Sequence, residues 1–350
     1  MIVDIVKVFL PSLISFSFGM LIAPVLASYL YEKNMWKKKS VQIALSGEAA
    51  TISAKLHNDE NRKTPRMGGV VIWGSTLITI LLFWAISYFF PTTISGKLDF
   101  LSRNQTWFPL FILIAGAIFG LVDDYLVCRE RGDYKGGGLA LTTRLGLVFL
   151  IALFSALWFY IKLDVSSIYI PFFGNLFLGW FFIPFFILFV IGIYSGGIID
   201  GVDGLSGGVF AVIYSIYALL AYFNGQVDLA AFAAVIVGSI LAFLWYNIPP
   251  ARFFNSETGT MALTTCIVVL AFLTGHAAVL PIIAFLLIIT SASSLIQILS
   301  KKYRGKKVFI VAPLHNHFQA IGWPASKVTM RYWILSVMFG ILGLVVALLG

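Results

Sequence analysis

The chain has 350 residues, of which 60% are hydrophobic and 11% are charged, and its formal net charge is +9. Soluble domains carry about 25% charged residues, so this composition excludes a water-soluble domain and indicates an integral membrane protein. The two cysteines, Cys128 and Cys266, lie far apart, which argues against a disulfide framework or a cysteine zinc cluster.

Apolar runs long enough for transmembrane helices recur along the chain. A spanning helix needs roughly 20 apolar residues. The first run is too long for a cleaved signal peptide and lacks a small-residue cleavage site, so we expect it to be a retained span. The sequence therefore predicts an all-α, polytopic membrane protein with a single domain over residues 1–350. The roughly ten expected spans are 8–30, 68–90, 107–122, 144–162, 177–197, 207–223, 229–246, 259–275, 277–299 and 332–349.

The ninth expected span contains small polar residues, TSASS at 290–294. Such a patch predicts a kink or a break in the helix. We find no internal repeat and no soluble domain between the spans.

Lys and Arg residues are distributed unevenly among the connections. An even number of spans places both termini on one side and the odd-numbered connections together on the other. All of the 24 Lys and Arg residues fall in the odd-numbered connections except Lys7, Lys97, Arg103 and Lys162. Positive charge favours the cytoplasmic side, so we expect both termini to be extracytoplasmic. The positive charge is then a topology signal and requires no nucleic-acid partner.

Polar residues that interrupt the apolar pattern fall in these expected cytoplasmic connections. A carboxylate at the bilayer centre costs about 2.5–3.5 kcal/mol on insertion scales, so acidic residues at span ends usually face a wet cavity or a cation. We therefore expect a polar site at the cytoplasmic face. Its candidate residues, in chain order, are Lys63, Thr64, Asp123, Asp124, Asp200, Asp203, Glu257, His315 and His317.

The segment IIDGVDGLSGG at 198–208 places two carboxylates and four glycines between apolar spans. Gly201 and Gly204 favour a tight turn, whereas a helix would put both carboxylates on one face. Either conformation brings the carboxylates together. Asp203 is alternatively an N-cap for the sixth span.

Asp123 and Asp124 are adjacent at the end of the third span. Adjacent positions cannot share one helical face. We expect the two carboxylates to serve different partners.

Several carboxylates in one pocket are typical of magnesium-dependent phosphoryl transfer. Mg²⁺ takes one or two carboxylates, waters and substrate phosphates, and it brings two anionic reactants together. A carboxylate can also deprotonate a phosphate nucleophile. The sequence KGGGLA at 135–140 is too loose for a phosphate-binding loop and favours a flexible connection.

His315 and His317 are two positions apart, so an extended segment would place both side chains on one side. A zinc site requires four ligands, and no cysteine cluster lies near. Contact with a phosphate or sugar and a structural role remain the two interpretations.

Five segments in chain order resemble the polyprenyl-phosphate N-acetylhexosamine-1-phosphate transferase family. KTPRMGG at 63–69 resembles its TPxMGG segment, and GLVDDYL at 120–126 resembles its DDYL motif. IIDGVDGLSGG is similar to NLTDGLDGLA, and FLWYNIPPARFFNSETGTMAL at 243–263 is similar to FLWFNxxPAxxFMGDxGSLAL. APLHNHFQAIGW at 312–323 resembles APxHHHFExxGW, which is typical of the branch that makes the first lipid-linked precursor of peptidoglycan, the phospho-N-acetylmuramoyl-pentapeptide transferases.

The resemblance implies that UDP-MurNAc-pentapeptide and undecaprenyl phosphate react with Mg²⁺ to give lipid I and UMP. It implies that Asp123 or Asp124 deprotonates or orients the lipid phosphate, with Glu257 and Asp123 at the metal. Asp200 and Asp203 would position the nucleotide or the metal. It also implies a homodimer with a lipid-accessible groove in the bacterial cytoplasmic membrane, and direct attack and a covalent phospho-enzyme both stay open. The implied substrate-binding residues are Lys63, Thr64, Asn247, His315 and His317.

Four positions depart from the family pattern: Gly197 replaces Asn, Glu257 replaces Asp, Asn316 replaces His and Gln319 replaces Glu. These departures leave open a transferase for GlcNAc or another hexosamine 1-phosphate, and a member without activity. A secondary transporter also uses broken helices and buried carboxylates. Transporter sites, however, lie near the membrane midplane and often accompany a two-half repeat.

Overall fold

The structure, a computed structural model, describes residues 2–37, 63–101, 105–132 and 137–350. Within these ranges, 10 helices are long and apolar enough to cross a membrane, so the protein is an all-α, multi-pass membrane protein. They are α1 (Ile2–Glu32), α3 (Gly69–Phe89), α5 (Trp107–Cys128), α6 (Leu141–Leu157), α7 (Phe182–Ser195), α8 (Leu205–Phe223), α9 (Val227–Asn247), α10 (Ser256–Leu273), α12 (Phe285–Arg304) and α14 (Ala325–Leu349).

Shorter elements join these helices. A π-helical turn, Trp158–Lys162, extends α6, and a 3-10 turn, Gly179–Phe181, precedes α7. The remaining short elements are α4 (Thr93–Leu98), the 3-10 turns Gly196–Ile199 and Ala277–Val279, α11 (Leu280–Ile283) and α13 (Leu314–Ala320).

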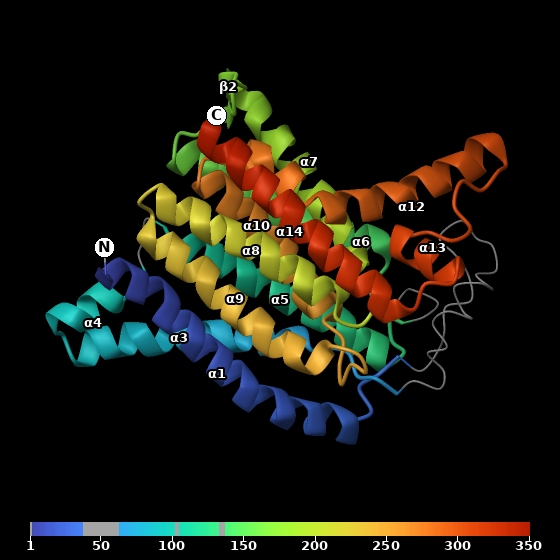
Figure 1. Ribbon diagram of the computed structural model, residues 1–350, viewed down its shortest axis with the longest axis horizontal. Coiled ribbons are helices and arrows are strands. Elements are labelled where there is room, and N and C mark those ends of the chain that lie inside the picture. The colour runs from blue at the N-terminus through green and yellow to red at the C-terminus, as the bar shows by residue number, and fades with distance from the viewer. Residues whose placement is uncertain (1, 38–62, 102–104, 133–136) are drawn as a thin grey trace.

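Helix α10 lies at the centre of the bundle and is the most buried of the spans. It packs mainly against α5, and also against α7 and α3. A second layer is formed by α1, α8 and α9, in which α9 packs against both neighbours (Figure 1). The backbone of the first turn of α10 is closely approached by Gly69 of α3 and Gly120 of α5.

The connections that carry the predicted polar residues meet at one end of the bundle, which we call the site end. Helix α5 ends there, and α3, α6, α8, α10 and α14 begin there. Both chain ends lie at the opposite end (Figure 1). This arrangement agrees with the predicted grouping of the odd-numbered connections.

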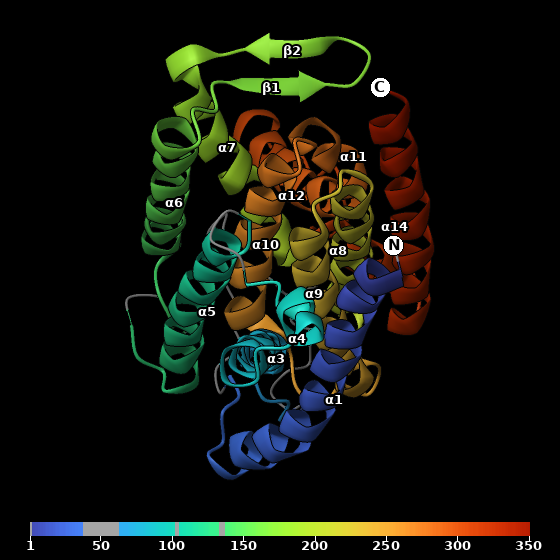
Figure 2. The ribbon, with the colours of Figure 1, turned by 90° about the vertical axis from the view of Figure 1, so that its left-hand side faces the viewer.

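A β-hairpin covers part of the end opposite the site. Strand β1 (Ser167–Ile170) pairs antiparallel with β2 (Gly174–Phe177), with Ser167 opposite Phe177. The hairpin crosses the top of the bundle near the C-terminus (Figure 2), where the Tyr169 hydroxyl donates to the carbonyl of Gly350. The sequence analysis did not predict it.

The predicted ninth span is broken, but at a different position from the one expected. The helix stops at Ile283 and restarts at Phe285, so the break lies at Ala284. The polar patch at 290–294 is inside a continuous helix, where the hydroxyls of Thr290, Ser291 and Ser293 bond to carbonyls three or four residues earlier. The Thr290 hydroxyl, for example, donates to Leu286 at 2.6 Å. Beyond the break, α12 projects away from the bundle (Figure 1).

Candidate functional site

All five predicted carboxylates lie at the site end of the bundle. Asp123 and Asp124 are in the last turns of α5, and Asp200 and Asp203 lie just before α8. Glu257 is in the first turn of α10. The structure thus brings together carboxylates from three separate parts of the chain.

Gly120 allows α5 to touch the first turn of α10. A Cβ atom at this position would overlap the backbone carbonyl of Glu257. Small residues let helix backbones approach closely in membrane proteins. The contact lies one turn before the paired aspartates, so it sets those two carboxylates beside Glu257.

Asp123 and Glu257 share one cation, Arg144 at the start of α6. Nη1 of Arg144 donates to Oε1 of Glu257 at 3.0 Å, and Nε lies 3.7 Å from Oδ1 of Asp123. The backbone N–H of Leu139 donates to the same Asp123 oxygen at 2.6 Å. The Tyr194 hydroxyl donates to Oε2 of Glu257 at 3.2 Å. Two carboxylates from different helices therefore converge on one guanidinium.

Asp124 is fully buried, and both of its oxygens accept hydrogen bonds. Oδ1 accepts from Nε of Arg66 at 2.9 Å and lies 2.9 Å from Nη2. Oδ2 accepts from the backbone N–H of Thr258 at 2.9 Å and from its hydroxyl at 2.6 Å. Asp124 therefore fastens the segment before α3 and the start of α10 to α5. The adjacent aspartates serve different partners, as the sequence predicted.

Residues 200–204, which we call the aspartate loop, form the tight turn that their glycines favour. The Asp200 carboxylate accepts from the Ser206 hydroxyl at 2.5 Å and from the backbone N–H of Ser256 at 2.7 Å. Burial raises the pKa of the Asp200 carboxyl above its ordinary value, and these two hydrogen bonds oppose the shift. The Asp203 carboxylate accepts from the backbone N–H of Ala251 at 3.0 Å.

The interpretation of Asp203 as a helix cap is wrong. The residue at the N-cap of α8 is Gly204, in a left-handed conformation, and no side chain caps the helix. This turn directs the Asp203 carboxylate away from α8 and toward Ala251. Asp203 therefore joins two connections of the site end.

Asn247, predicted to contact substrate, is buried within the protein. Its Oδ1 accepts from the backbone N–H of Gly204 at 3.0 Å, and its Nδ2 donates to the carbonyl of Phe253 at 2.8 Å. The structure therefore places Asn247 as a brace between the aspartate loop and the connection that precedes α10.

Helix α14 holds the aspartate loop from the other side. The Thr329 hydroxyl donates to the carbonyl of Asp203 at 2.9 Å. Nε1 of Trp333 donates to the carbonyl of Gly204 at 3.0 Å. The loop that carries two carboxylates is thus fixed through its main chain.

His315 and His317 lie on α13 and have different surroundings. His315 is 1% exposed and packs against the aspartate loop, where a Cβ atom at Gly201 would lie 2.7 Å from its Nε2. Nδ1 of His317 accepts weakly from the backbone N–H of Ile310 at 3.4 Å, and its ring contacts Phe309. The expected extended segment with both side chains on one side is wrong, because residues two apart on a helix do not face each other.

Lys63 and Thr64 lie in the segment that leads into α3. Lys63 is exposed and Thr64 is buried. The segment is fixed by the backbone of Phe254, whose N–H donates to the carbonyl of Pro65 at 2.9 Å. Arg66 in the same segment bonds to Asp124, so the segment that carries Lys63 is tied to the carboxylate cluster.

Two cations of the cluster were assigned only to topology in the sequence analysis. Arg66 and Arg144 each bind a predicted site carboxylate. Arg66 was identifiable from its place inside the PRMGG segment, and Arg144 from its position at the start of an apolar run. Tyr194 and Thr258 carried no such signal.

The donor set around Arg144 contains two of the oxygen ligands that Mg²⁺ takes in proteins. Among the described residues, no group of three or more His, Cys, Asp or Glu side chains could hold a metal alone. Mg²⁺, however, needs only one or two carboxylates when water and substrate phosphates complete its shell. Asp123 and Glu257 supply two such carboxylates, and Arg144 balances their charge.

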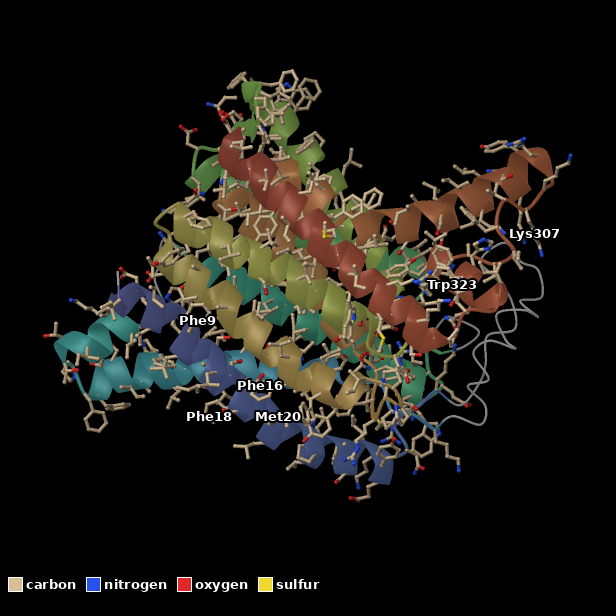
Figure 3. All side chains as sticks on the ribbon, viewed as in Figure 1. Phe9, Phe16, Phe18, Met20, Lys307 and Trp323 are labelled. Carbon is tan, nitrogen blue, oxygen red and sulfur yellow. The ribbon has the colours of Figure 1, made fainter. Side chains whose placement is uncertain are left out.

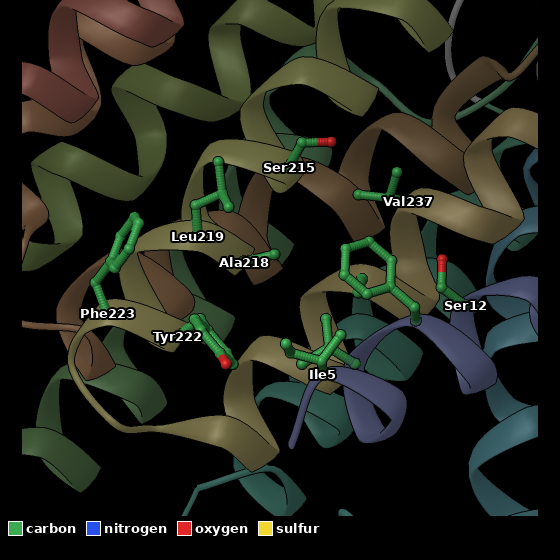
Figure 4. A pocket seen from close by; sticks show the side chains of 11 residues that line it. Ile5, Ser12, Ser215, Ala218, Leu219, Tyr222, Phe223 and Val237 are labelled. Carbon is green, nitrogen blue, oxygen red and sulfur yellow. The ribbon is translucent and has the colours of Figure 1, made fainter. Parts of the chain in front are cut away.

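An apolar cavity of about 460 Å³ lies far from this chemistry. Its lining comes from α1, α8 and α9 and includes Val8, Phe9, Leu219 and Phe223 (Figure 4). It is at the end of α8 that is distant from the aspartate loop. The cavity therefore does not belong to the candidate site.

Known proteins match the chain over most of its length. A family model, Glycosyl transferase family 4, matches residues 106–275. A phospho-N-acetylmuramoyl-pentapeptide-transferase of Pelagibacter ubique (strain HTCC1062) is 32% identical over 302 residues, which cover 80% of this chain and 79% of the relative. The protein of that name from Rickettsia massiliae (strain Mtu5) is 34% identical over 301 residues, with the same coverage.

The matched region contains the whole carboxylate cluster from α5 to α10, and the identity extends well beyond the shorter family model. A relative from Bartonella quintana (strain Toulouse) with the same printed name is 32% identical over 299 residues. Together with the five motifs, these similarities show that the chain belongs to the phospho-N-acetylmuramoyl-pentapeptide-transferase family.

Proposed function

We propose that the protein transfers phospho-MurNAc-pentapeptide from its UDP derivative to undecaprenyl phosphate, giving lipid I and UMP. The observation that carries this proposal is the convergence of Asp123 and Glu257 on Arg144 at one end of a membrane bundle. Arg144 and a Mg²⁺ ion held by the two carboxylates would offset the negative charge of two reacting phosphates. The names of the relatives supply the substrate class.

The contacts of the paired aspartates divide their roles. Both oxygens of Asp124 are engaged by Arg66 and Thr258. The described contacts of Asp123 all involve Oδ1. We therefore assign the deprotonation or orientation of the lipid phosphate to Asp123 and a positioning role to Asp124.

In this proposal Asp123 and Glu257 hold Mg²⁺, which would neutralise charge on the reacting phosphates. Arg144 contacts the same two carboxylates. Once Mg²⁺ offsets their charge, the guanidinium would contact a phosphate oxygen of a substrate. Glu257 reaches Arg144 and Tyr194 at once, so its longer side chain is compatible with the role of the family aspartate.

The donor is assigned to the rim of the cluster. Lys63 is exposed there and suits the pyrophosphate. Thr64 and His315 border the same region, while Asp200, Asp203 and Asn247 would set the shape of the nucleotide site through the main chain. His317 lies toward Phe309 and suits the sugar or peptide part of the donor.

The distribution of Lys and Arg residues supports an orientation of the protein in the membrane. We propose that the site end faces the cytoplasm, that both termini are extracytoplasmic, and that the protein works in the bacterial cytoplasmic membrane as a homodimer. Most Lys and Arg residues lie in connections at the site end, and cytoplasmic loops are enriched in these residues.

UMP release by the purified protein in detergent tests the proposal. Undecaprenyl phosphate and Mg²⁺ would be supplied, with UDP-MurNAc-pentapeptide in one reaction and UDP-GlcNAc in another. We expect release in the first reaction only, and its loss in Asp123→Asn. UMP release with UDP-GlcNAc alone would assign the protein to the hexosamine-1-phosphate branch. Absence of UMP release in both reactions, from a folded sample, would contradict a transferase.

A further inference from the structure

The second half of α12 and the chain that follows it form a basic projection, residues 295–310, which we call the basic arm. The chain contains no Asp or Glu after Glu257, so the arm has charge of one sign. Its cations are Lys301, Lys302, Arg304, Lys306 and Lys307, and all except the partly buried Lys301 are exposed.

The same arm exposes large apolar side chains. Leu295, Leu299 and Tyr303 follow one another at intervals of four along α12, with exposed fractions of 57%, 42% and 74%. Residues at this spacing share one face of a helix. Because α12 is one of the membrane-crossing helices, this apolar face would lie among the acyl chains, and the basic end that follows it would lie at the level of the headgroups.

The arm stands clear of the bundle. Helix α12 projects from it (Figure 1), and Lys307 lies near the outer tip of the projection (Figure 3). The helix ends at Arg304 because Gly305 takes a left-handed conformation, and the chain then turns back toward α13. Long Lys and Arg side chains can keep their apolar stems near lipid while their charges reach the headgroups.

The arm is braced internally and leads to the candidate site. The Gln297 side chain bonds to the backbone of Val308 and Phe309 at 2.9–3.0 Å. The Ser300 hydroxyl donates to the carbonyl of Lys306 at 2.9 Å. This bracing fixes the cations and the apolar face in one unit, which continues into α13.

We propose that the basic arm binds anionic phospholipids of the surrounding membrane, with its cations on the headgroups and its apolar face among the acyl chains. A topology signal needs only the positive charge. The additional observation is that the cations are braced at the end of a helix that projects from the bundle and exposes an apolar face beside them (Figure 1), which favours a lipid over a soluble anion. Near an anionic membrane surface each Lys or Arg contributes about a five-fold gain in affinity.

Native mass spectrometry of the full-length protein in neutral detergent would test this inference. The protein is titrated with phosphatidylglycerol and, separately, with phosphatidylcholine, and bound lipids are counted. We expect the wild-type protein to bind phosphatidylglycerol at least about ten-fold more tightly. Equal binding of both lipids would overturn the proposal.

Charge variants assign the binding to the arm. The arm variant is K302Q/R304Q/K306Q/K307Q. A matched control, R129Q/R131Q/K162Q/R252Q, removes the same charge from exposed residues elsewhere. We expect the preference for phosphatidylglycerol to disappear in the arm variant and to persist in the control. Loss of the preference in both variants, or in neither, would contradict a site on the arm.

Two further measurements keep the test decisive. If the four-fold arm variant does not fold, K306Q/K307Q, which leaves α12 intact, should still weaken phosphatidylglycerol binding several-fold. Inorganic phosphate at millimolar concentration should not displace the lipid from the wild-type protein. Displacement by phosphate would show an anion site without an acyl component and overturn the lipid assignment.

Discussion

At the residue scale, the two adjacent aspartates of α5 differ in what surrounds them. Asp124 has no exposed surface and is enclosed by Arg66 and Thr258. Asp123 contacts Arg144 and the Leu139 amide beside Glu257. Substitution of one should therefore change stability, and substitution of the other should change chemistry.

Asp124→Asn should lower stability because it leaves the Arg66 guanidinium without its counterion. Removal of one partner of a buried pair costs roughly 3–5 kcal/mol, and Arg66 retains 24% side-chain exposure, which puts the expected cost at the low end. Thermal midpoints in detergent measure the effect. Asp123→Asn is the matched control, which should keep its midpoint within a few degrees yet lose at least about 100-fold in UMP release.

The Asp200 carboxyl predicts a dependence of stability on pH. Burial raises the pKa of this carboxyl above its ordinary value, so the folded protein keeps this proton at pH values where the unfolded chain has lost it. Its contribution is therefore full at acidic pH and falls as the pH rises through the raised pKa. Thermal midpoints across this range should fall less steeply in Asp200→Asn, and parallel slopes would contradict the prediction.

At the element scale, short segments are held against one another by main-chain contacts. The aspartate loop touches α13 through Gly201 and His315, and α14 through Thr329 and Trp333. Helix α13 in turn follows the basic arm in the chain and is tied to α12 just before the arm, where the Ser293 hydroxyl accepts from the backbone N–H of Leu314 at 2.9 Å. Lipid contact on the arm is thus mechanically connected to the site.

Gly201→Ala should displace His315, because the new Cβ atom would lie 2.7 Å from Nε2 of its ring. Overpacking of this kind costs typically about 1–3 kcal/mol, and we expect UMP release to fall by at least about ten-fold. Gly192→Ala is the control, since nothing lies within 4 Å of that position. Adding His315→Ala to the Gly201 variant should restore the thermal midpoint, and failure to restore it would contradict the contact.

Under the proposed function, the connection from arm to site predicts that anionic lipid stimulates the reaction. UMP release in nanodiscs should rise as phosphatidylglycerol replaces phosphatidylcholine. The K302Q/R304Q/K306Q/K307Q variant should show a flat response while retaining the basal rate. A rise of equal size in the variant would mean that the lipid acts elsewhere.

The sequence predicted which segments form helices better than it predicted which residues contact one another. Apolar length alone identified ten spans, and GLVDDYL and IIDGVDGLSGG identified carboxylates that do meet. It missed the β-hairpin at 167–177, which lies in the connection before the expected span 177–197. It also misplaced the break in the ninth span, because the hydroxyls of Thr290, Ser291 and Ser293 bond within the helix. Arg144 could not be paired with Glu257, since 113 positions separate them.

At the scale of the whole molecule, the bundle has two ends with different chemistry. The hairpin and both termini lie at one end (Figure 1), and the connections that carry the carboxylates meet at the other. Positive charge is concentrated at the second end. The proposed orientation follows from this asymmetry and can be measured without any assay of activity.

Cysteine labelling tests the orientation. Cys128 and Cys266 are both buried, so an introduced cysteine would dominate the reaction with a membrane-impermeant maleimide. Phe173→Cys, in the hairpin at a position with 88% exposure, should label in intact cells, whereas Lys307→Cys should label only after lysis. The reverse pattern would invert the proposed topology.

The carboxylates of the site are held largely by backbone amides. Leu139, Ala251, Ser256 and Thr258 each donate a main-chain N–H to one of them. A peptide group is present whatever side chain a position carries, so drift in these neighbours would leave the geometry intact. Single-residue insertions or deletions in the same connections would instead shift every donor. Over evolutionary time the site should therefore tolerate substitutions at these donor positions far better than insertions or deletions between them.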